Sequence, residues 1–476
     1  MAVVPQMQHS IESRISNIDV YEGDTETIIK HGENISVCAK FHIEIYGCQM
    51  NVYDAQRISE LLQFCGFEKA KCHEDADILI FYTCNIREKA AARLFSNINI
   101  FKNQKTKVVA VGGCVVQAEK ENMFRHKAIN IVFGPQIYHK LPEYIMDVIN
   151  GKRDRIMDVG MPQMEKFKAI PVKQNVSYSE FVTIQEGCNN FCTYCIVPYT
   201  RGPECSRPAI DILHETKHLV ENGAQEITLL GQNVNSYHGE AAYLGIGGKK
   251  TWDITRLLYE VAKIPGIRRL RYVTSHPKDF NKELMTAHRE IDVLVPFVHI
   301  PLQSGSNKIL RLMNRGHTVE EYLDKLAMFR DIAPNIQFSS DFIVGFPQET
   351  DEDLQATIDA ARMADYSFSY AFKYSPRKKT PASRMQDQIP EEEKEARLAK
   401  LYSVLQESQL KYNQSIVGTI QETLFEKEGR RENQYVGKNV YLQSIVVEAD
   451  ESPIGKFMNV KITKATQNSV FGEIIQ

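Results

Sequence analysis

Residues 186–195, EGCNNFCTYC, decide how the rest of the chain is interpreted, because three cysteines fall within eight residues. Cys188, Cys192 and Cys195 come directly after an expected strand at 181–185. Thiolates spaced this closely in one loop are typical of an iron–sulfur cluster. Three ligands for a four-iron cluster leave one iron open to a substrate or cofactor. Zinc is an alternative, but it would need a fourth Cys or His, and the only nearby thiol is Cys205.

Strands and helices alternate for about 200 residues around this loop. Apolar runs predict strands at 181–185, 226–230, 269–274, 293–300, 337–344 and 368–374. Helical spacing predicts helices that include 210–222, 254–263, 319–332 and 351–364. Six strand–helix units predict a barrel or partial barrel whose active face lies where the strands end.

A second strand–helix series precedes this barrel. Strands are expected at 41–47, 76–83, 107–112 and 128–134, and helices at 54–64 and from Asn85 to Ile98. The second helix opens with Asn85 followed three residues later by Glu88, a capping box. This alternation indicates a parallel α/β sheet.

Three further cysteines, Cys48, Cys84 and Cys114, each follow one of these strands. Groups at the same place in parallel units emerge at the carboxyl edge of the sheet, where ligands bind in open α/β folds. Cys84 also precedes a helix N-terminus, which favours a thiolate. The alternative is three buried structural cysteines. The repeated placement at strand ends favours a second ligand set.

The fold class is therefore α/β, with an N-terminal parallel βαβ sheet domain, a central partial barrel of the TIM type and a small C-terminal β-barrel. The expected divisions are a polar extension at 1–38, the sheet domain at 39–155, a linker at 156–178, the barrel at 179–407 and the β-barrel at 408–476. A charged helix at 391–413 leaves the central barrel. Short strands at 419–426, 434–440, 446–448, 456–462 and 470–475 predict a module of a kind that often binds nucleic acid.

Composition excludes several classes. The chain has 476 residues and a net charge of -3, which argues against a nonspecific DNA binder. No apolar run approaches the roughly 18 residues of a membrane span, and no signal peptide is evident. We therefore expect a cytoplasmic protein without a membrane partner. In that compartment its ten cysteines favour metal binding or catalysis over disulfides.

Several motifs together resemble one known family. They are Gly47-Cys-Gln-Met-Asn51, Thr83-Cys-Asn-Ile-Arg-Glu-Lys-Ala90, Gly112-Gly-Cys114, Glu186-Gly-Cys-Asn189, Tyr199-Thr-Arg-Gly202, Leu230-Gly-Gln-Asn-Val234, Thr274-Ser-His-Pro277 and Ser339-Ser-Asp-Phe-Ile-Val-Gly-Phe-Pro347. From about residue 40 to the end, the chain resembles the methylthiotransferase branch of the radical S-adenosylmethionine (SAM) family, including a C-terminal TRAM-like module. The first two motifs are similar to those of the tRNA enzymes of that branch. The chain departs from the family pattern at Tyr82, Asn85, Glu204-Cys205 and Arg377-Lys-Lys-Thr380.

The resemblance implies a reaction and its cofactors. An adenine C2–H in isopentenyl (dimethylallyl) adenosine, next to the tRNA anticodon, would be replaced by S–CH3. Two [4Fe-4S] clusters are implied, one on Cys188, Cys192 and Cys195 for radical generation from SAM. The other, on Cys48, Cys84 and Cys114, would serve sulfur insertion. Candidate contacts to SAM lie in the cysteine loop and after barrel strands: Tyr194, Gln232, Asn233, Ser275, Gln303 and Asp341.

Partners are less directly indicated. The strongest positive stretch, which could contact RNA phosphates or be a solvated loop, contains Lys373, Arg377, Lys378, Lys379 and Arg384. Of these, Arg377, Lys378 and Lys379 are the expected RNA-binding residues. We also expect tRNA carrying isopentenyl-adenosine, an electron donor such as flavodoxin or ferredoxin, sulfur and iron–sulfur assembly donors, and a monomer.

Other functions stay open on sequence grounds. The same chemistry could act on threonylcarbamoyl-adenosine tRNA or on a ribosomal protein aspartate. A noncatalytic iron–sulfur electron-transfer protein and a zinc-binding RNA module are alternatives of another class. Structural roles are expected for Cys65, Cys205, His276 and His299.

Overall fold

The computed structural model describes residues 39–84, 94, 96–98, 108–162, 166–167, 171–243 and 250–475. These residues fall into two compact units. One runs to Gln174 and includes Tyr199–Gly202, and the other comprises Asn175–Pro198 and Pro203–Gln476. The expected extension at 1–38 and most of the expected helix from Asn85 to Ile98 lie outside the described residues.

The first unit contains a six-stranded parallel sheet in the order β2-β1-β3-β4-β5-β6. Its strands are β1 (Lys40–Tyr46), β2 (Glu68–Lys69), β3 (Ile78–Thr83), β4 (Val108–Gly113), β5 (Ile131–Phe133) and β6 (Ile156–Asp158). Every residue of β3 and β4 is buried. This explains their unbroken apolar sequence, because a central parallel strand is covered on both faces.

Helices cover both faces of this sheet. Helices α3 (Gln49–Phe64) and α6 (Leu141–Ile149) pack over one face, against Ile78, Ile80 and Tyr82 of β3. Helix α5 (Cys114–Glu119) contributes to the core on the other face, against Leu79 and Phe81. The predicted α/β alternation is confirmed.

Two short edge strands were not predicted. β6 lies in the segment expected to be a linker, and β2 has only two residues, both exposed. Neither contains enough residues to show a period-2 pattern, so only pairing with β5 and β1 reveals them. Helix α3 also begins five residues earlier than predicted, at Gln49, directly after Cys48.

The second unit contains six parallel barrel strands. They form two sheets, β7 (Ser179–Thr183) with β10 (Glu226–Leu230) and β11 (Arg269–Tyr272), and β12 (Phe297–His299) with β13 (Gln337–Val344) and β14 (Phe368–Lys373). A parallel bridge between Leu270 and Leu294 connects β11 to the segment before β12. Within the described residues β7 and β14 are the two edges, so the predicted partial barrel is confirmed.

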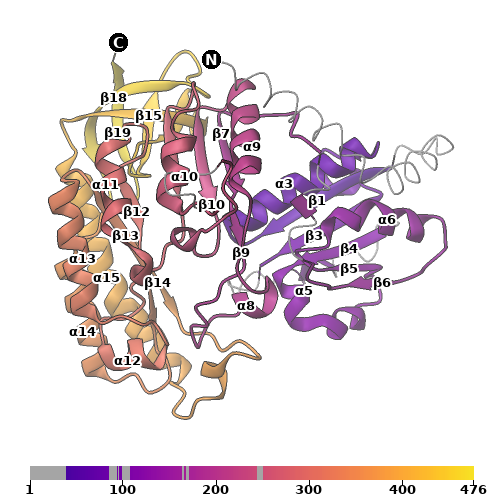
Figure 1. The fold of residues 1–476 in the computed structure, drawn as a ribbon, viewed down its shortest axis with the longest axis horizontal. Helices are drawn as coiled ribbons and strands as arrows, with labels where there is room; N and C mark the ends of the chain where they lie inside the picture. The colour runs from indigo at the N-terminus through magenta and orange to yellow at the C-terminus, as the bar shows by residue number, and fades with distance from the viewer. Residues whose placement is uncertain are drawn as a thin grey trace. The chain divides into compact units, whose positions relative to one another are not determined.

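Helices cover the outer face of these strands. They are α9 (Ala209–Glu221), α10 (Ile254–Val261), α11 (Lys282–Glu290), α13 (Val319–Ile332), α14 (Asp351–Ala364) and α15 (Glu391–Ser415). The short helix α12 (Asn307–Leu312) follows β12 and contacts Thr193 through the Leu312 carbonyl. Helices α13, α14 and α15 lie side by side along the sheet of β12, β13 and β14 (Figure 1). Capping boxes at Thr318 and Glu321, and at Thr350 and Asp353, explain why α13 and α14 begin at their predicted residues.

Residues 420–475 form a closed five-stranded barrel in the order β15-β16-β17-β19-β18, as predicted. Its strands are β15 (Ile420–Glu428), β16 (Gln434–Lys438), β17 (Ser444–Glu448), β18 (Phe457–Ala465) and β19 (Val470–Ile475). Two buried arginines of β11 hold it to the central barrel. Arg269 Nη1 donates to the carbonyl of Lys438 at 3.0 Å, and Arg271 Nη1 donates to that of Val440 at 2.6 Å. Among the described residues no helix is long and apolar enough to cross a membrane.

Candidate functional site

Cys48, Cys84 and Cys114 come together at the carboxyl edge of three neighbouring strands of the first sheet. They follow β1, β3 and β4, which are adjacent in the strand order. Cys48 is the N-cap residue of α3, and Cys114 is the first residue of α5. The Cys84 thiol hydrogen-bonds Cys48 and lowers the Cys48 pKa to about 6. Residues that are 36 and 30 positions apart in sequence therefore share one place in the fold.

Two glycines make this close approach possible. Gly47 has φ of +129°, and a Cβ at this position would lie 2.1 Å from Cys84 Cβ. Gly113 has φ of +96°, and its Cβ would lie 2.4 Å from the carbonyl oxygen of Thr83. Both positions exclude any side chain on steric and conformational grounds. The glycines before Cys48 and Cys114 therefore let the strand ends converge.

A buried charged network lies beside these thiols. Asp54 Oδ2 accepts from Arg201 Nη2 at 2.6 Å and from the Tyr82 hydroxyl at 3.0 Å, and Lys166 Nζ lies 3.6 Å from Asp54 Oδ1. Burial raises the pKa of the Cys114 thiol, whereas the charge and hydrogen bond of Arg201 oppose that increase. The positive charge of Arg201 lowers the pKa of both Cys48 and Cys114 and so favours their thiolate forms.

Cys188, Cys192 and Cys195 lie in a loop that the segment after α12 holds in place. Thr193 donates its backbone N–H to Met313 O at 3.0 Å and its hydroxyl to Leu312 O at 2.8 Å. Burial raises the pKa of Cys188, and raises that of Cys195 to about 12. Thiols this reluctant to ionise stay protonated until a metal displaces the proton.

Arg315 contacts this loop and was not predicted from the sequence. Its side chain is buried, Nη1 lies 3.5 Å from Cys192 Sγ, and Nη2 donates to Pro301 O at 2.6 Å. Each cysteine trio therefore has one buried arginine hydrogen-bonded to a thiol. Arg201 falls within a motif quoted above, whereas Lys166 and Arg315 carried no sequence signal.

Among the described residues no set of three or more His, Cys, Asp or Glu side chains is arranged as a ready-made metal cage. The two trios nevertheless suit an iron–sulfur cluster in donor type and position. Thiolates are the ligands that such clusters use, and the adjacent Arg201 and Arg315 would offset the negative charge that forms when the protons leave.

At the barrel mouth, which we define as the carboxyl ends of the barrel strands, three of the six predicted SAM contacts have a buried side-chain oxygen that lacks a hydrogen-bond partner among the described residues. They are Asn233 Oδ1 after β10, Ser275 Oγ after β11 and Gln303 Oε1 after β12. An unpartnered buried polar group costs about 1–3 kcal/mol, so such groups are expected where a ligand satisfies them. These three side chains fit a polar small molecule at the mouth.

The other three predicted contacts are already engaged within the protein. Gln232 Oε1 accepts from the Gly187 backbone N–H at 2.5 Å. Asp341 lies 3.4 Å from His299 Nε2, and His299 Nδ1 hydrogen-bonds the Ser339 hydroxyl at 2.7 Å. Tyr194 packs against the apolar cluster that contains Met313, Phe346 and Tyr374. Burial raises the pKa of Tyr194 far above its ordinary value, so the phenol stays neutral.

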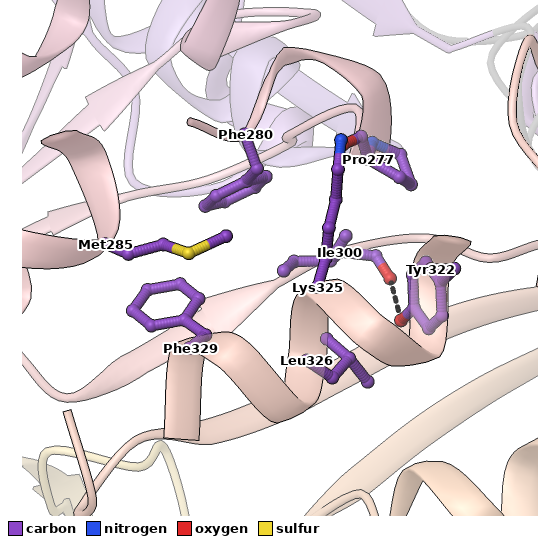
Figure 2. A pocket seen from close by; sticks show the side chains of 8 residues that line it. All are labelled: Pro277, Phe280, Met285, Ile300, Tyr322, Lys325, Leu326 and Phe329. Atoms are coloured by element: carbon purple, nitrogen blue, oxygen red, sulfur yellow. Dashed lines mark hydrogen bonds between the residues drawn. The ribbon is translucent and has the colours of Figure 1, made fainter. Parts of the chain in front are cut away.

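A pocket elsewhere in the barrel unit is not a candidate site. Figure 2 shows it between α13, α11 and the end of β12, lined by Pro277, Phe280, Met285, Ile300, Tyr322, Lys325, Leu326 and Phe329. Its polar groups are satisfied by the protein, since the Tyr322 hydroxyl donates to Ile300 O at 2.8 Å and Lys325 Nζ donates to Pro277 O at 2.7 Å. It is a packing gap in an apolar core.

The predicted basic stretch follows β14, but its members differ. Lys378, Lys379 and Arg384 are exposed, and Arg377 is half-buried. Lys373 forms ion pairs with Glu391 and Glu395 of α15, which raise its pKa. Lys373 is therefore paired with two carboxylates of α15, which the local sequence did not reveal.

A Cys-x3-Cys-x2-Cys loop after the first strand of a partial parallel barrel defines a radical SAM protein. Three family models match the chain: Radical SAM superfamily at residues 182–361, Uncharacterized protein family UPF0004 at 40–134 and TRAM domain at 414–475. The chain belongs to the family of tRNA-2-methylthio-N(6)-dimethylallyladenosine synthases. It is 45% identical to the synthase of Zymomonas mobilis, over 91% of this chain and 96% of that protein. It is 46% identical to the synthase of Wolbachia pipientis from Culex pipiens, over 90% of this chain and 98% of that protein.

A solved structure shows the same fold at low sequence identity. The radical S-adenosylmethionine methyltransferase TsrM from Kitasatospora setae aligns with a TM-score of 0.53 and 14% identity, covering 81% of this chain and 78% of that chain. At this identity the comparison supports the fold alone.

Proposed function

We propose that the protein methylthiolates C2 of isopentenyl (dimethylallyl) adenosine adjacent to the tRNA anticodon. SAM would be both methyl donor and radical source, and a second iron–sulfur cluster would take part in sulfur insertion. The observation that carries the proposal is the presence of two separate cysteine trios at strand ends, in a chain of this family.

The chemistry requires a radical. An adenine C2 hydrogen is too weakly acidic for a side-chain base, so it must be removed as a hydrogen atom. Cys188, Cys192 and Cys195 would hold a cluster that would supply an electron for the cleavage of SAM, and Cys48, Cys84 and Cys114 would hold a cluster that would take part in sulfur insertion. The chain's own contribution is to bind, orient and shield these groups.

Specific side chains would perform these tasks. Asn233, Ser275 and Gln303 would satisfy their buried oxygens on polar groups of SAM at the barrel mouth. Gln232 would orient the cysteine loop through Gly187, and Tyr194 would shield the loop as a neutral apolar wall. Asp341, paired with His299, would fix the polarity of the inner barrel face.

The proposed partners follow from the same reaction. The exposed Lys378 and Lys379, together with Arg377, would contact tRNA phosphates, and the C-terminal barrel would add a second RNA contact. A reductant such as flavodoxin or ferredoxin and donors of sulfur and iron–sulfur clusters are required by the chemistry. We propose a cytoplasmic monomer.

The test is mass spectrometry of tRNA nucleosides from cells with and without the gene. The proposal predicts that deletion removes methylthio-isopentenyl-adenosine and leaves its unthiolated precursor, and that the wild-type gene restores the product. Loss of methylthio-threonylcarbamoyl-adenosine, or of a ribosomal protein modification, would instead assign one of the alternative substrates.

A further inference from the structure

One face of the edge strand β14 presents a row of aromatic side chains, Phe368, Tyr370 and Phe372, which we call the aromatic row. The exposed fraction is 53% for Tyr370 and 45% for Phe372. Their rings stack with centroids 6.5 Å apart, and Tyr370 meets Phe368 edge-on at 5.7 Å. Phe368 in turn stacks on Phe297 of β12 at 5.3 Å. These are contiguous rings, unlike the scattered apolar residues common on protein surfaces.

The strand register places the aromatic row on the inner face of the barrel. Phe368, Tyr370 and Phe372 pair with Ser339, Asp341 and Ile343 of β13 and therefore share their face. The alternate β13 residues belong to the outer face. Phe338 lies 5.5 Å from Phe329 of helix α13, and Phe342 joins the same helix-covered core.

The β14 residues that alternate with the aromatic row face outward. Lys373 contacts Glu391 and Glu395 of α15, and Ala371 packs on the helix-covered core. The exposed rings are therefore on the side where a barrel normally fills its interior with side chains. An exposed aromatic inner face at the edge of a partial barrel is a surface for a flat, apolar ligand.

The charge around the aromatic row indicates what that ligand is. The chain leaves β14 directly into the loop with the exposed Lys378, Lys379 and Arg384. Flat rings followed by cations match a nucleotide in RNA, whose base stacks while its phosphates meet the cations. Proteins that modify a base take it out of its stack and hold it against aromatic or apolar side chains.

We propose that Tyr370 and Phe372 form the stacking surface for the target adenine and its branched, five-carbon isopentenyl group. This inference rests on the proposed function and assigns its specificity to the aromatic row. The isopentenyl group adds apolar area, and burying that area against an apolar surface stabilises binding. The aromatic row would thus select the prenylated base over plain adenosine.

The experiment compares two synthetic anticodon stem-loops, one with isopentenyl-adenosine and one with adenosine, for binding to the reconstituted full-length protein. Wild type is expected to prefer the prenylated RNA. Tyr370→Ala and Phe372→Ala should each reduce that preference roughly tenfold, because they remove apolar area that contacts the isopentenyl group, which plain adenosine lacks. Tyr370→Phe keeps the ring and should keep the preference. Tyr402→Ala removes an exposed tyrosine on α15 and serves as the matched control.

Two further measurements make each outcome decisive. SAM binding by equilibrium dialysis should be unchanged in the alanine variants, and a loss of SAM affinity instead would overturn the inference. An unchanged RNA preference in both alanine variants would also overturn the inference. If the unfolding midpoints of these variants were lower as well, the aromatic row would be a contact within the protein. If wild type itself shows no preference and forms no methylthio product, the proposed function fails.

Discussion

Gly47 shows how one absent side chain shapes the first cysteine site. In the substitution Gly47→Ala the new methyl group would overlap Cys84 Cβ, on a backbone with φ of +129°. We expect the cysteine trio to be pushed apart, so that reconstituted protein holds about four irons per chain instead of about eight. Iron analysis measures this directly. Gly66→Ala is the matched control, because Gly66 also has a positive φ of +88° but nothing within 4 Å. Equal iron loss in both variants would contradict the steric explanation.

Asp54 pairs with both Arg201 and Lys166, and all three side chains are buried. In Asp54→Ala two buried cations lose the Asp54 carboxylate as an ion-pair partner, which we expect to lower the free energy of unfolding of the first unit by roughly 3–5 kcal/mol. The rate of hydrogen exchange of the β3 amides in the full chain would measure this loss of stability.

The control for this prediction is Asp359→Ala, which removes an exposed partner of Arg362. An exposed pair contributes little, so no measurable change is expected there. If Asp54→Ala leaves exchange in β3 as slow as in wild type, the charged network does not stabilise the unit.

Single residues also show what the sequence could and could not predict about the site. The convergence of Cys48, Cys84 and Cys114 follows from strand periodicity, because equivalent positions in parallel units must meet at one edge. Arg315 could not be predicted, since only the folded chain brings it to Cys192 from 123 residues away. Gln232 follows β10, and its side chain accepts a hydrogen bond from the Gly187 backbone, a partner that spacing does not reveal.

Helices and long buried strands were predictable because their patterns are long. Helices α13 and α14 match their expected bounds to the residue, and each has its capping box in the sequence. β2 and β6 were missed because a strand of two or three residues is too short to show an alternation of apolar and polar residues. The pairing of Lys373 was missed because α15 approaches β14 only in the fold.

The loop after β14 gives a prediction about RNA affinity. Lys378→Glu with Lys379→Glu reverses two exposed charges without touching the core. We expect weaker tRNA binding and a slope of log affinity against log salt that is smaller by about 2, because two phosphates would no longer be neutralised by lysine. Filter binding at several salt concentrations measures both quantities.

The matched control reverses two exposed lysines on other elements, Lys282 of α11 and Lys400 of α15. Net charge changes equally in the two double variants. An equal loss of affinity in both would show a nonspecific charge effect and remove the loop from the RNA-binding surface.

The two compact units of the described chain each contain one trio of cysteines and one buried arginine at a thiol. A single electron-transfer site would need neither the second trio nor the C-terminal barrel. The division also allows the two sites to be tested independently, because the loss of one trio leaves the other unit's core unchanged.

The most direct test of the two-cluster account is iron and sulfide analysis of anaerobically reconstituted protein. Wild type is compared with two triple variants, one with Cys48, Cys84 and Cys114 changed to alanine, the other with Cys188, Cys192 and Cys195 changed. The account predicts about eight irons in wild type and about four in each variant, with no methylthio product from either. A full iron content in one triple variant, zinc in place of iron, or methylthio product without the first trio would contradict it.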